Sequence, residues 1–205
     1  LGLGYGMGAA KFYTTVAVQG NILLDDGVAD TTVSFWRKKN YKIVESWRRA
    51  DRAIFDMASP GMEPYDWGCV RVERNRIALP NGLYLTYPNL QIVEDMERGT
   101  RQFEYWNGQY MTGIWGGTLI ENIIQALARI IMSDQMIEVN RIVAPMSKDS
   151  GLALTVHDEA VFVVPETEAE YVYEKLGEVM AKTPEWADDR LPLASEGGIA
   201  ENYSK

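Results

Sequence analysis

The chain has 205 residues, of which 46% are hydrophobic, and it carries a formal net charge of −9 at pH 7. This length and hydrophobic content suffice for one large or two small folded domains and exclude a disordered chain. The single cysteine, Cys69, excludes an intrachain disulfide framework, and the sequence contains neither a signal peptide nor an uncharged apolar run long enough to cross a membrane. We therefore expect a globular, cytoplasmic protein in which Cys69 is a packed side chain.

Helices are expected throughout the first 58 residues. After a glycine-rich start, LGLGYGMG, apolar residues recur at near-helical intervals up to residue 19, and Gly20-Asn21 supplies a stop. Residues 21–58 show helical periodicity in two pieces, with residues 25–27 as a loop. The predicted core positions of these two pieces are Val33, Trp36, Tyr41, Val44, Trp47 and Ile54.

Positive charge is concentrated in residues 37–52, RKKNYKIVESWRRADR. This stretch carries seven basic residues against two acidic ones, whereas acidic residues are in excess in the rest of the chain. Such a run is typical of a solvated helix face, but it is equally consistent with contact to phosphate groups. The sequence leaves both interpretations open.

The clearest break in the pattern is at residues 59–68, which contain two prolines and two glycines. Short β-strands are predicted after it, around residues 69–73, 76–78 and 84–87. A further strand and turn pair is expected within residues 101–111.

A long helix is predicted over residues 115–131, WGGTLIENIIQALARII. Thr118 and Glu121 have the spacing of a capping box. A buried stripe is expected at Ile120, Ile123, Ile124, Leu127, Ile130 and Ile131. Asn122, Gln125 and Arg129 form a neighbouring polar stripe, which suits either plain solvent exposure or contact with the groove of a duplex.

The stretch around which the chain is organised is GLALTVHDEAVFVVPE, residues 151–166. Apolar runs at 152–156 and 160–164 flank His157, Asp158 and Glu159, which predicts a hairpin of two buried strands with acids at its tip. Two adjacent carboxylates beside the only histidine suit a hard divalent cation directed at phosphate. Acidic hairpin tips are also common in turns without a function, so the triplet alone decides nothing.

An amphipathic helix is predicted after the hairpin, over residues 168–181. Its inward positions are expected to be Tyr171, Val172, Leu176 and Val179. We expect this helix to brace the hairpin.

Residues 154–159, LTVHDE, resemble the Val-His-Asp-Glu motif in the palm of family A (DNA polymerase I type) DNA polymerases. Three further stretches resemble the same family in the same order. Residues 1–8 are similar to the end of its fingers helix, residues 115–131 to the palm helix before the hairpin, and residues 191–205 to the C-terminal tail of phage-type members. Together these stretches span the chain.

The resemblance implies an α+β fold. Residues 1–58 would be a partial, mainly helical fingers subdomain. Residues 59–205 would be the C-terminal portion of the palm, an antiparallel sheet with packed helices, and would include the metal-binding hairpin at 152–164.

The implied activity is template-directed DNA synthesis from deoxynucleoside triphosphates on primer-template DNA, with two Mg²⁺ ions. Asp158 would bind metal and Glu159 would orient the same catalytic site, while His157 would touch the primer terminus. Tyr5 and Gly6 match residues near the templating base. Asn122, Gln125 and Arg129 are the other candidate DNA contacts, but Thr112 and Gly116 stand where bacterial relatives place groove-contacting amides.

The family's second metal-binding aspartate, and the lysine and arginine that bind the triphosphate, belong to motifs upstream of the residues present. We therefore expect a C-terminal fragment that needs the upstream remainder of the polymerase and is inactive alone. A non-catalytic fragment that binds DNA or a partner chain is the alternative. An unrelated metal-dependent phosphohydrolase using Asp158 and Glu159 ranks last, because the chain has only one histidine.

Overall fold

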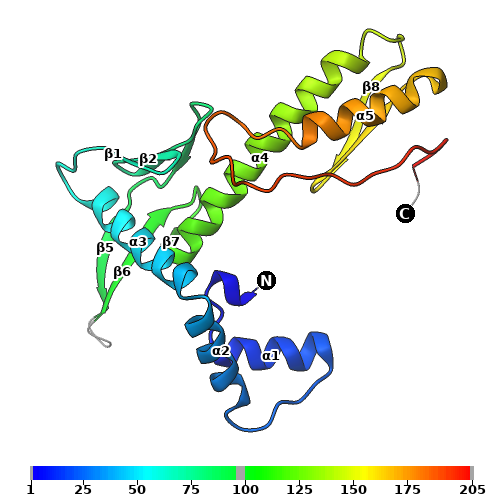
Figure 1. Cartoon of the computed structure of the whole chain (residues 1–205). Coiled ribbons are helices and arrows are strands. Elements are labelled where there is room, and N and C mark those ends of the chain that lie inside the picture. Colours follow the sequence, from blue (N-terminus) through cyan, green and yellow to red (C-terminus); the bar gives the residue numbers. More distant parts are fainter. Residues whose placement is uncertain (1, 96–99, 204–205) are drawn as a thin grey trace. The chain divides into compact units, whose positions relative to one another are not determined.

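The computed structural model describes residues 2–95 and 100–203, and it has a mixed α+β architecture (Figure 1), as expected. Within these residues the strands form three separate antiparallel sheets. By their internal contacts the residues divide into two compact units, 1–125 and 126–205. The fingers and palm assignments of residues 1–58 and 59–205 remain predictions.

The first unit begins with helices, as predicted. A 3₁₀-helix, η1 (Gly2–Tyr5), precedes α1 (Ala9–Gly20), α2 (Val28–Lys39) and α3 (Tyr41–Ala58). The predicted stop of α1 is confirmed, because Asn21 has a left-handed φ of 50° and its backbone N–H donates to the Val16 carbonyl. Helices α2 and α3 are divided at Asn40, whose side-chain amide donates to the Trp36 carbonyl at 2.9 Å.

Tryptophan side chains organise the core around α3. The Trp47 ring stacks on Trp36, with 6.4 Å between ring centroids, and meets Trp115 edge-on at 5.6 Å. The buried residues of α3 are Trp47, Ala50, Ala53, Ile54 and Met57. The prediction that Tyr41 belongs to this core is wrong, because Tyr41 is 61% exposed. Tyr41 begins the helix and lies on the face opposite these buried positions, as its spacing from them requires.

A four-stranded sheet follows α3. Its strands are β1 (Tyr65–Trp67), β2 (Val70–Glu73), β3 (Arg76–Ala78) and β4 (Tyr84–Thr86), in the order β1-β2-β3-β4. The three predicted strands are confirmed, whereas β1, within the proline- and glycine-rich segment, was not expected. Burial raises the pKa of the nearby Cys69 thiol, which disfavours the reactive thiolate.

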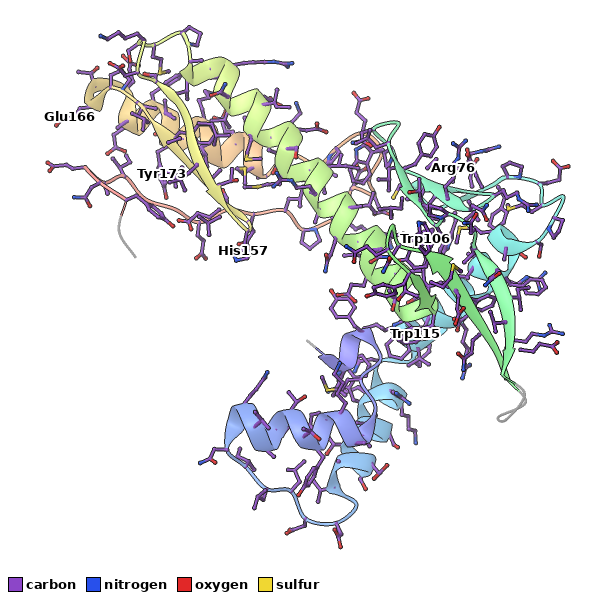
Figure 2. All side chains as sticks on the ribbon, turned by 180° about the vertical axis from the view of Figure 1, so that it is seen from behind. Arg76, Trp106, Trp115, His157, Glu166 and Tyr173 are labelled. Carbon is purple, nitrogen blue, oxygen red and sulfur yellow. The ribbon has the colours of Figure 1, made fainter. Side chains whose placement is uncertain are left out.

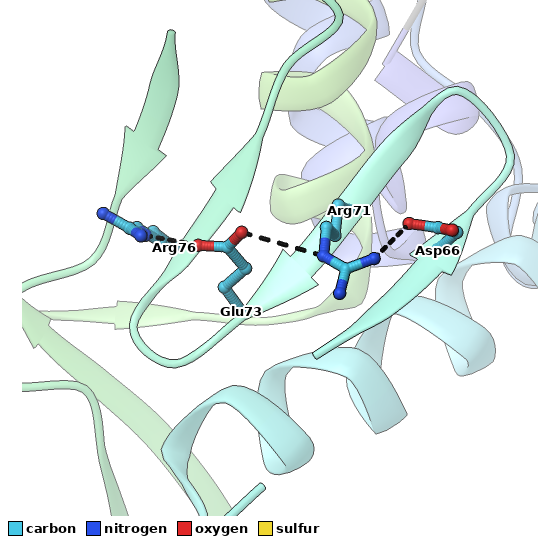
Figure 3. Close-up of polar contacts among 4 residues, drawn as sticks. All are labelled: Asp66, Arg71, Glu73 and Arg76. Carbon is cyan, nitrogen blue, oxygen red and sulfur yellow. Dashed lines mark hydrogen bonds and ion pairs between the residues drawn. The ribbon is translucent and has the colours of Figure 1, made fainter. Parts of the chain in front are cut away.

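Basic residues on this sheet are paired with acids (Figure 3). Arg71 contacts Asp66 at 2.8 Å and Glu73 at 3.9 Å, and Arg76 contacts Glu73 at 2.7 Å. Exposed pairs of this kind stabilise a fold by about 1 kcal/mol or less. Their main effect is to neutralise the positive charge of this surface.

The second sheet leads into the longest described helix. Strands β5 (Gln91–Asp95), β6 (Thr100–Trp106) and β7 (Met111–Ile114) pair in that order, and α4 (Gly116–Val143) follows. The predicted strand and turn pair is thus confirmed, and β5 was not expected. None of the described helices, α4 included, has the length and apolarity needed to span a membrane.

The predicted capping box at the start of α4 is wrong. The helix begins at Gly116, two residues before Thr118. Its first turn is capped from α3, because Asp51 Oδ1 accepts a hydrogen bond from the Gly116 N–H at 2.6 Å. Glu121 instead accepts from the side-chain amide of Gln125 at 3.3 Å. Burial raises the pKa of Asp51, and the Gly116 amide partly offsets that rise.

The predicted apolar stripe of α4 is only partly buried. The buried apolar residues of this helix are Leu119, Ile123, Ile130, Met136, Val139 and Val143. Ile124, placed in the buried stripe from the sequence, is 51% exposed. The buried face follows positions 119, 123 and 130, and Ile124 projects about 100° or more away from each of them, outside that face.

The second unit contains the hairpin and the last helix. Strands β8 (Gly151–Val156) and β9 (Glu159–Val163) precede a short 3₁₀-helix, η2 (Glu166–Glu168), and α5 (Ala169–Met180). The core of this unit is formed by Val139, Val143, Val172 and Val179, packed against Met146, Phe162, Val164 and Leu176. Phe162 of β9 and Val172 of α5 share this cluster, which confirms that α5 braces the hairpin.

Two expectations for this unit are wrong. The expected burial of both strands is not found: Leu152 and Leu154 of β8 are each 38% exposed and Val163 of β9 is 48% exposed. In a two-stranded sheet each strand is an edge strand with a neighbour on one side only. Tyr171 is 47% exposed and lies outside the apolar face of α5.

A buried hydrogen bond also ties α5 to α4 within this unit. Gln135 is 8% exposed, and its Nε2 donates to the Met180 carbonyl at 3.0 Å, at the end of α5. Gln135→Met keeps the side-chain size but leaves that carbonyl unpaired, and we expect a loss of about 1–3 kcal/mol in the free energy of unfolding. Chemical denaturation followed by circular dichroism measures it. Gln125→Met, at an exposed position of the same helix, should change stability by less than about 0.5 kcal/mol; equal effects would contradict the role of Gln135.

Candidate active-site hairpin

The acidic triplet lies at the tip of the hairpin, as predicted from the sequence. His157 and Asp158 form a two-residue turn between β8 and β9, and Glu159 is the first residue of β9, opposite Val156. Figure 2 shows His157 at this tip. Its φ of +54° is in the left-handed region, as the tight turns of two-residue hairpins require at their first position. Asp158 is therefore held at an exposed, backbone-defined point.

The base of the hairpin is fixed to α4. The Leu152 N–H donates to Asn140 Oδ1 at 2.8 Å, next to an irregularity in the β8–β9 register between Leu152 and Leu154. On the neighbouring strand, Phe162 pairs with Leu152 and packs into the apolar cluster of this unit. These contacts limit hairpin movement and thereby the movement of the acids at its tip.

The C-terminal segment returns to the hairpin and reaches Glu159 (Figure 1). The Tyr203 hydroxyl donates to Glu159 Oε2 at 3.0 Å, and the Tyr173 hydroxyl of α5 donates to the Gly197 carbonyl at 3.2 Å. Sequence reasoning missed both tyrosines, because no local pattern links a tail residue to an acid 44 positions earlier. The Glu159 carboxylate is thus oriented by a side chain from outside the hairpin.

Tyr5 and Gly6 lie in the first unit, beside a hollow of about 910 Å³. Tyr5 lines this hollow together with Trp36 from α2 and Ile120 and Ile124 from α4. Gly6 has a φ of +83°, and a Cβ there would overlap the Trp115 indole ring. The lack of a side chain at Gly6 therefore lets the Trp115 ring, just before α4, pack against the backbone next to Tyr5.

The polar stripe of α4 is less uniform than the sequence suggests. Asn122 Nδ2 donates to the Tyr87 hydroxyl at 3.1 Å, whereas Gln125 and Arg129 are exposed. Tyr87 is 2% exposed, and burial raises its pKa to about 12. Asn122 thus donates a hydrogen bond to a buried hydroxyl group. The helical pattern of the sequence did not indicate this partner.

The chain is similar over its whole length to a phage DNA polymerase. It is 28% identical over 221 aligned residues to the DNA polymerase of Bacillus phage SP02. The alignment covers 100% of this chain and 31% of that polymerase, so the chain spans about a third of its relative. No protein-family model matches the chain. No solved structure matches it either.

The donor set at the tip fits part of a magnesium site. Asp158 and Glu159 offer carboxylate oxygens, which Mg²⁺ prefers over nitrogen or sulfur. Across residues 2–95 and 100–203, however, no group of three or more His, Cys, Asp or Glu side chains is placed to hold a metal ion. The hairpin alone therefore does not make up a full ligand set.

Proposed function

We propose that this chain is the C-terminal part of a family A, phage-type DNA-directed DNA polymerase and takes part in template-directed DNA synthesis. The observation that carries the proposal is its similarity along the whole chain to a phage DNA polymerase. The presentation of Asp158 and Glu159 at the tip of a supported hairpin adds to it. Residues 1–58 are then a partial fingers subdomain and residues 59–205 the C-terminal palm portion, acting in the host cytoplasm.

The reaction joins a deoxynucleotide to the primer. The oxygen of the primer 3′-hydroxyl bonds to the α-phosphorus, the bond from that phosphorus to the leaving pyrophosphate breaks, and the hydroxyl proton is released. Magnesium, when bound, would supply positive charge that stabilises the negative charge developing in this transfer. Asp158 would supply one ligand, Glu159 would orient the site from beside it, and His157 would contact the primer terminus.

The hairpin serves this reaction by positioning. Catalysis of in-line transfer depends on holding the reacting groups within a fraction of an ångström. The two-residue turn, the Asn140 bond at the base and the Tyr203 bond to Glu159 each restrict the acids. Deoxynucleoside triphosphates and primer-template DNA are then the substrates.

The DNA contacts are divided among several elements of the chain. Tyr5 and Gly6 would lie near the templating base, because they match the end of the fingers helix. Gln125 and Arg129 would contact the primer-template duplex from α4. Asn122 would add to these contacts while its amide keeps Tyr87 satisfied.

The test is primer extension by the isolated 205-residue chain and by the same chain joined to the upstream remainder of the polymerase. The proposed second metal-binding aspartate and the residues that bind the triphosphate are supplied by that remainder. We expect no detectable extension by the isolated chain with Mg²⁺, template and all four nucleotides, and extension by the joined protein. Extension by the 205 residues alone would show that the ligand assignment is wrong, and inactivity of the joined protein would contradict the polymerase proposal.

A further inference from the structure

A second hollow in the first unit is lined by positive charge. It measures about 480 Å³ and lies at the junction of α2 and α3. Its lining residues are Arg37, Lys38, Tyr41, Val44, Glu45 and Arg48. We call this feature the basic hollow.

The cations of the basic hollow are not neutralised within the described residues. Within residues 2–95 and 100–203, none of Arg37, Lys38 and Arg48 forms an ion pair with an acidic side chain. The one acid of the hollow, Glu45, is engaged by Arg49 at 2.7 Å. By contrast, Arg71 and Arg76 on the four-stranded sheet are paired with acids (Figure 3). In a chain of net charge −9, this leaves a local positive site suited to phosphate groups.

The basic hollow also offers an aromatic face. Tyr41, the first residue of α3, lines the hollow, and its side chain is 61% exposed. Arg37 and Lys38 lie in the last turn of α2, where the helix dipole favours positive charge. The dipole of α2 does not explain Arg48, which lies within α3, or the exposed ring of Tyr41. Positive charge combined with an exposed aromatic ring is the arrangement by which proteins bind single-stranded nucleic acid, because unpaired bases stack on the ring.

The basic hollow shares its helices with the hollow that contains Tyr5. Trp36 and Ile43 line the Tyr5 hollow, while their sequence neighbours Arg37 and Val44 line the basic hollow. The two hollows therefore lie on the same pair of helices, α2 and α3.

We infer that the basic hollow binds the unpaired template strand, with phosphates on Arg37, Lys38 and Arg48 and a base stacked on Tyr41. The inference rests on the proposed function, to which it adds a binding site for single-stranded DNA.

The test measures binding of a fluorescein-labelled oligothymidylate to the full 205-residue chain by fluorescence anisotropy across a salt series. Arg37→Gln with Arg48→Gln should weaken binding about tenfold or more. It should also lower the salt slope by about 1.4, because each phosphate contact on a single strand contributes about 0.7 to that slope. Tyr41→Ala should weaken binding about fivefold or more, whereas Tyr41→Phe should not, since Phe keeps the stacking face.

The matched control is Lys39→Gln with Lys42→Gln, which removes the same charge from the same helices outside the hollow. This control should change affinity less than twofold. An equal loss of affinity in both double variants would overturn the inference. Binding would then be explained by the general positive charge of an exposed helix face. Equal competition by polyglutamate or blunt duplex DNA, with no effect of Tyr41→Ala, would likewise overturn it.

Failure of this inference is distinguishable from failure of the proposed function. If the hollow variants bind the oligonucleotide like the control while the joined polymerase still requires Asp158 for extension, only the assignment of the hollow is wrong. If the joined protein does not extend primers, the proposed function itself fails, whatever the hollow binds.

Discussion

Replacing Asp158 with asparagine is expected to lower the rate of nucleotide incorporation by the joined polymerase on the order of a thousandfold, equivalent to about 4 kcal/mol of activation free energy. Asn keeps the size of the side chain but removes the negative charge that a hard cation requires. Asp158 is exposed at a turn, so the substitution leaves the core intact. Single-turnover incorporation of one nucleotide into a labelled primer measures the loss, which should fall on kcat more than on KM.

The charge-matched control is Asp149→Asn, an exposed acid ahead of β8 in the same unit. It should leave incorporation within about twofold of the unsubstituted rate, since a solvated surface charge makes little difference at a separate site. Tyr203→Phe should have an intermediate effect, because it removes one hydrogen bond to Glu159 and no proposed metal ligand. An unchanged rate in Asp158→Asn, with a normal melting temperature, would remove Asp158 from the catalytic site.

Features encoded within short stretches could be predicted from the sequence. The hairpin around His157 and Asp158 was found because apolar strands stop on both sides of a polar turn, and this signal lies within 16 residues. Helices α1 and α5 were found for the same reason, since their periodicity and end signals are local. The mixed α+β class was implied by the family resemblance, and the structure confirms it.

Contacts between distant positions could not be predicted from these patterns. Asp51 caps α4 from 65 residues away, so the local Thr118 and Glu121 spacing was misleading. Tyr203 reaches Glu159 across 44 residues, and nothing in the tail sequence marks that partner. The helical spacing of Tyr41 predicts a core position, whereas the fold leaves this side chain exposed. Such contacts depend on tertiary packing, which overrides local pattern and propensity.

The close approach of α3 to the start of α4 gives the largest expected effect on stability. A Cβ on Gly116 would lie 2.8 Å from the Trp47 carbonyl carbon and 2.9 Å from the Asp51 nitrogen, and it would overlap the Trp47 carbonyl oxygen. These are backbone atoms within a helix, so they cannot move aside as a side chain can. The Asp51 bond to the Gly116 N–H depends on the same approach.

Gly116→Ala should therefore destabilise the first unit by about 3 kcal/mol, at the upper end of the range for overpacking in a core. For a chain of this size, that loss corresponds to a decrease in melting temperature of about 6–12 °C. Tryptophan fluorescence suits the measurement, because Trp47 and Trp115 are in contact beside Gly116. The matched control is Gly177→Ala within α5, where a Cβ meets no atom within 4 Å. There the same substitution should stabilise the helix by about 0.5–1 kcal/mol, since alanine loses less backbone freedom on folding than glycine. Opposite signs at the two glycines are the expected result, and stabilisation at both would show that α3 and α4 do not approach this closely.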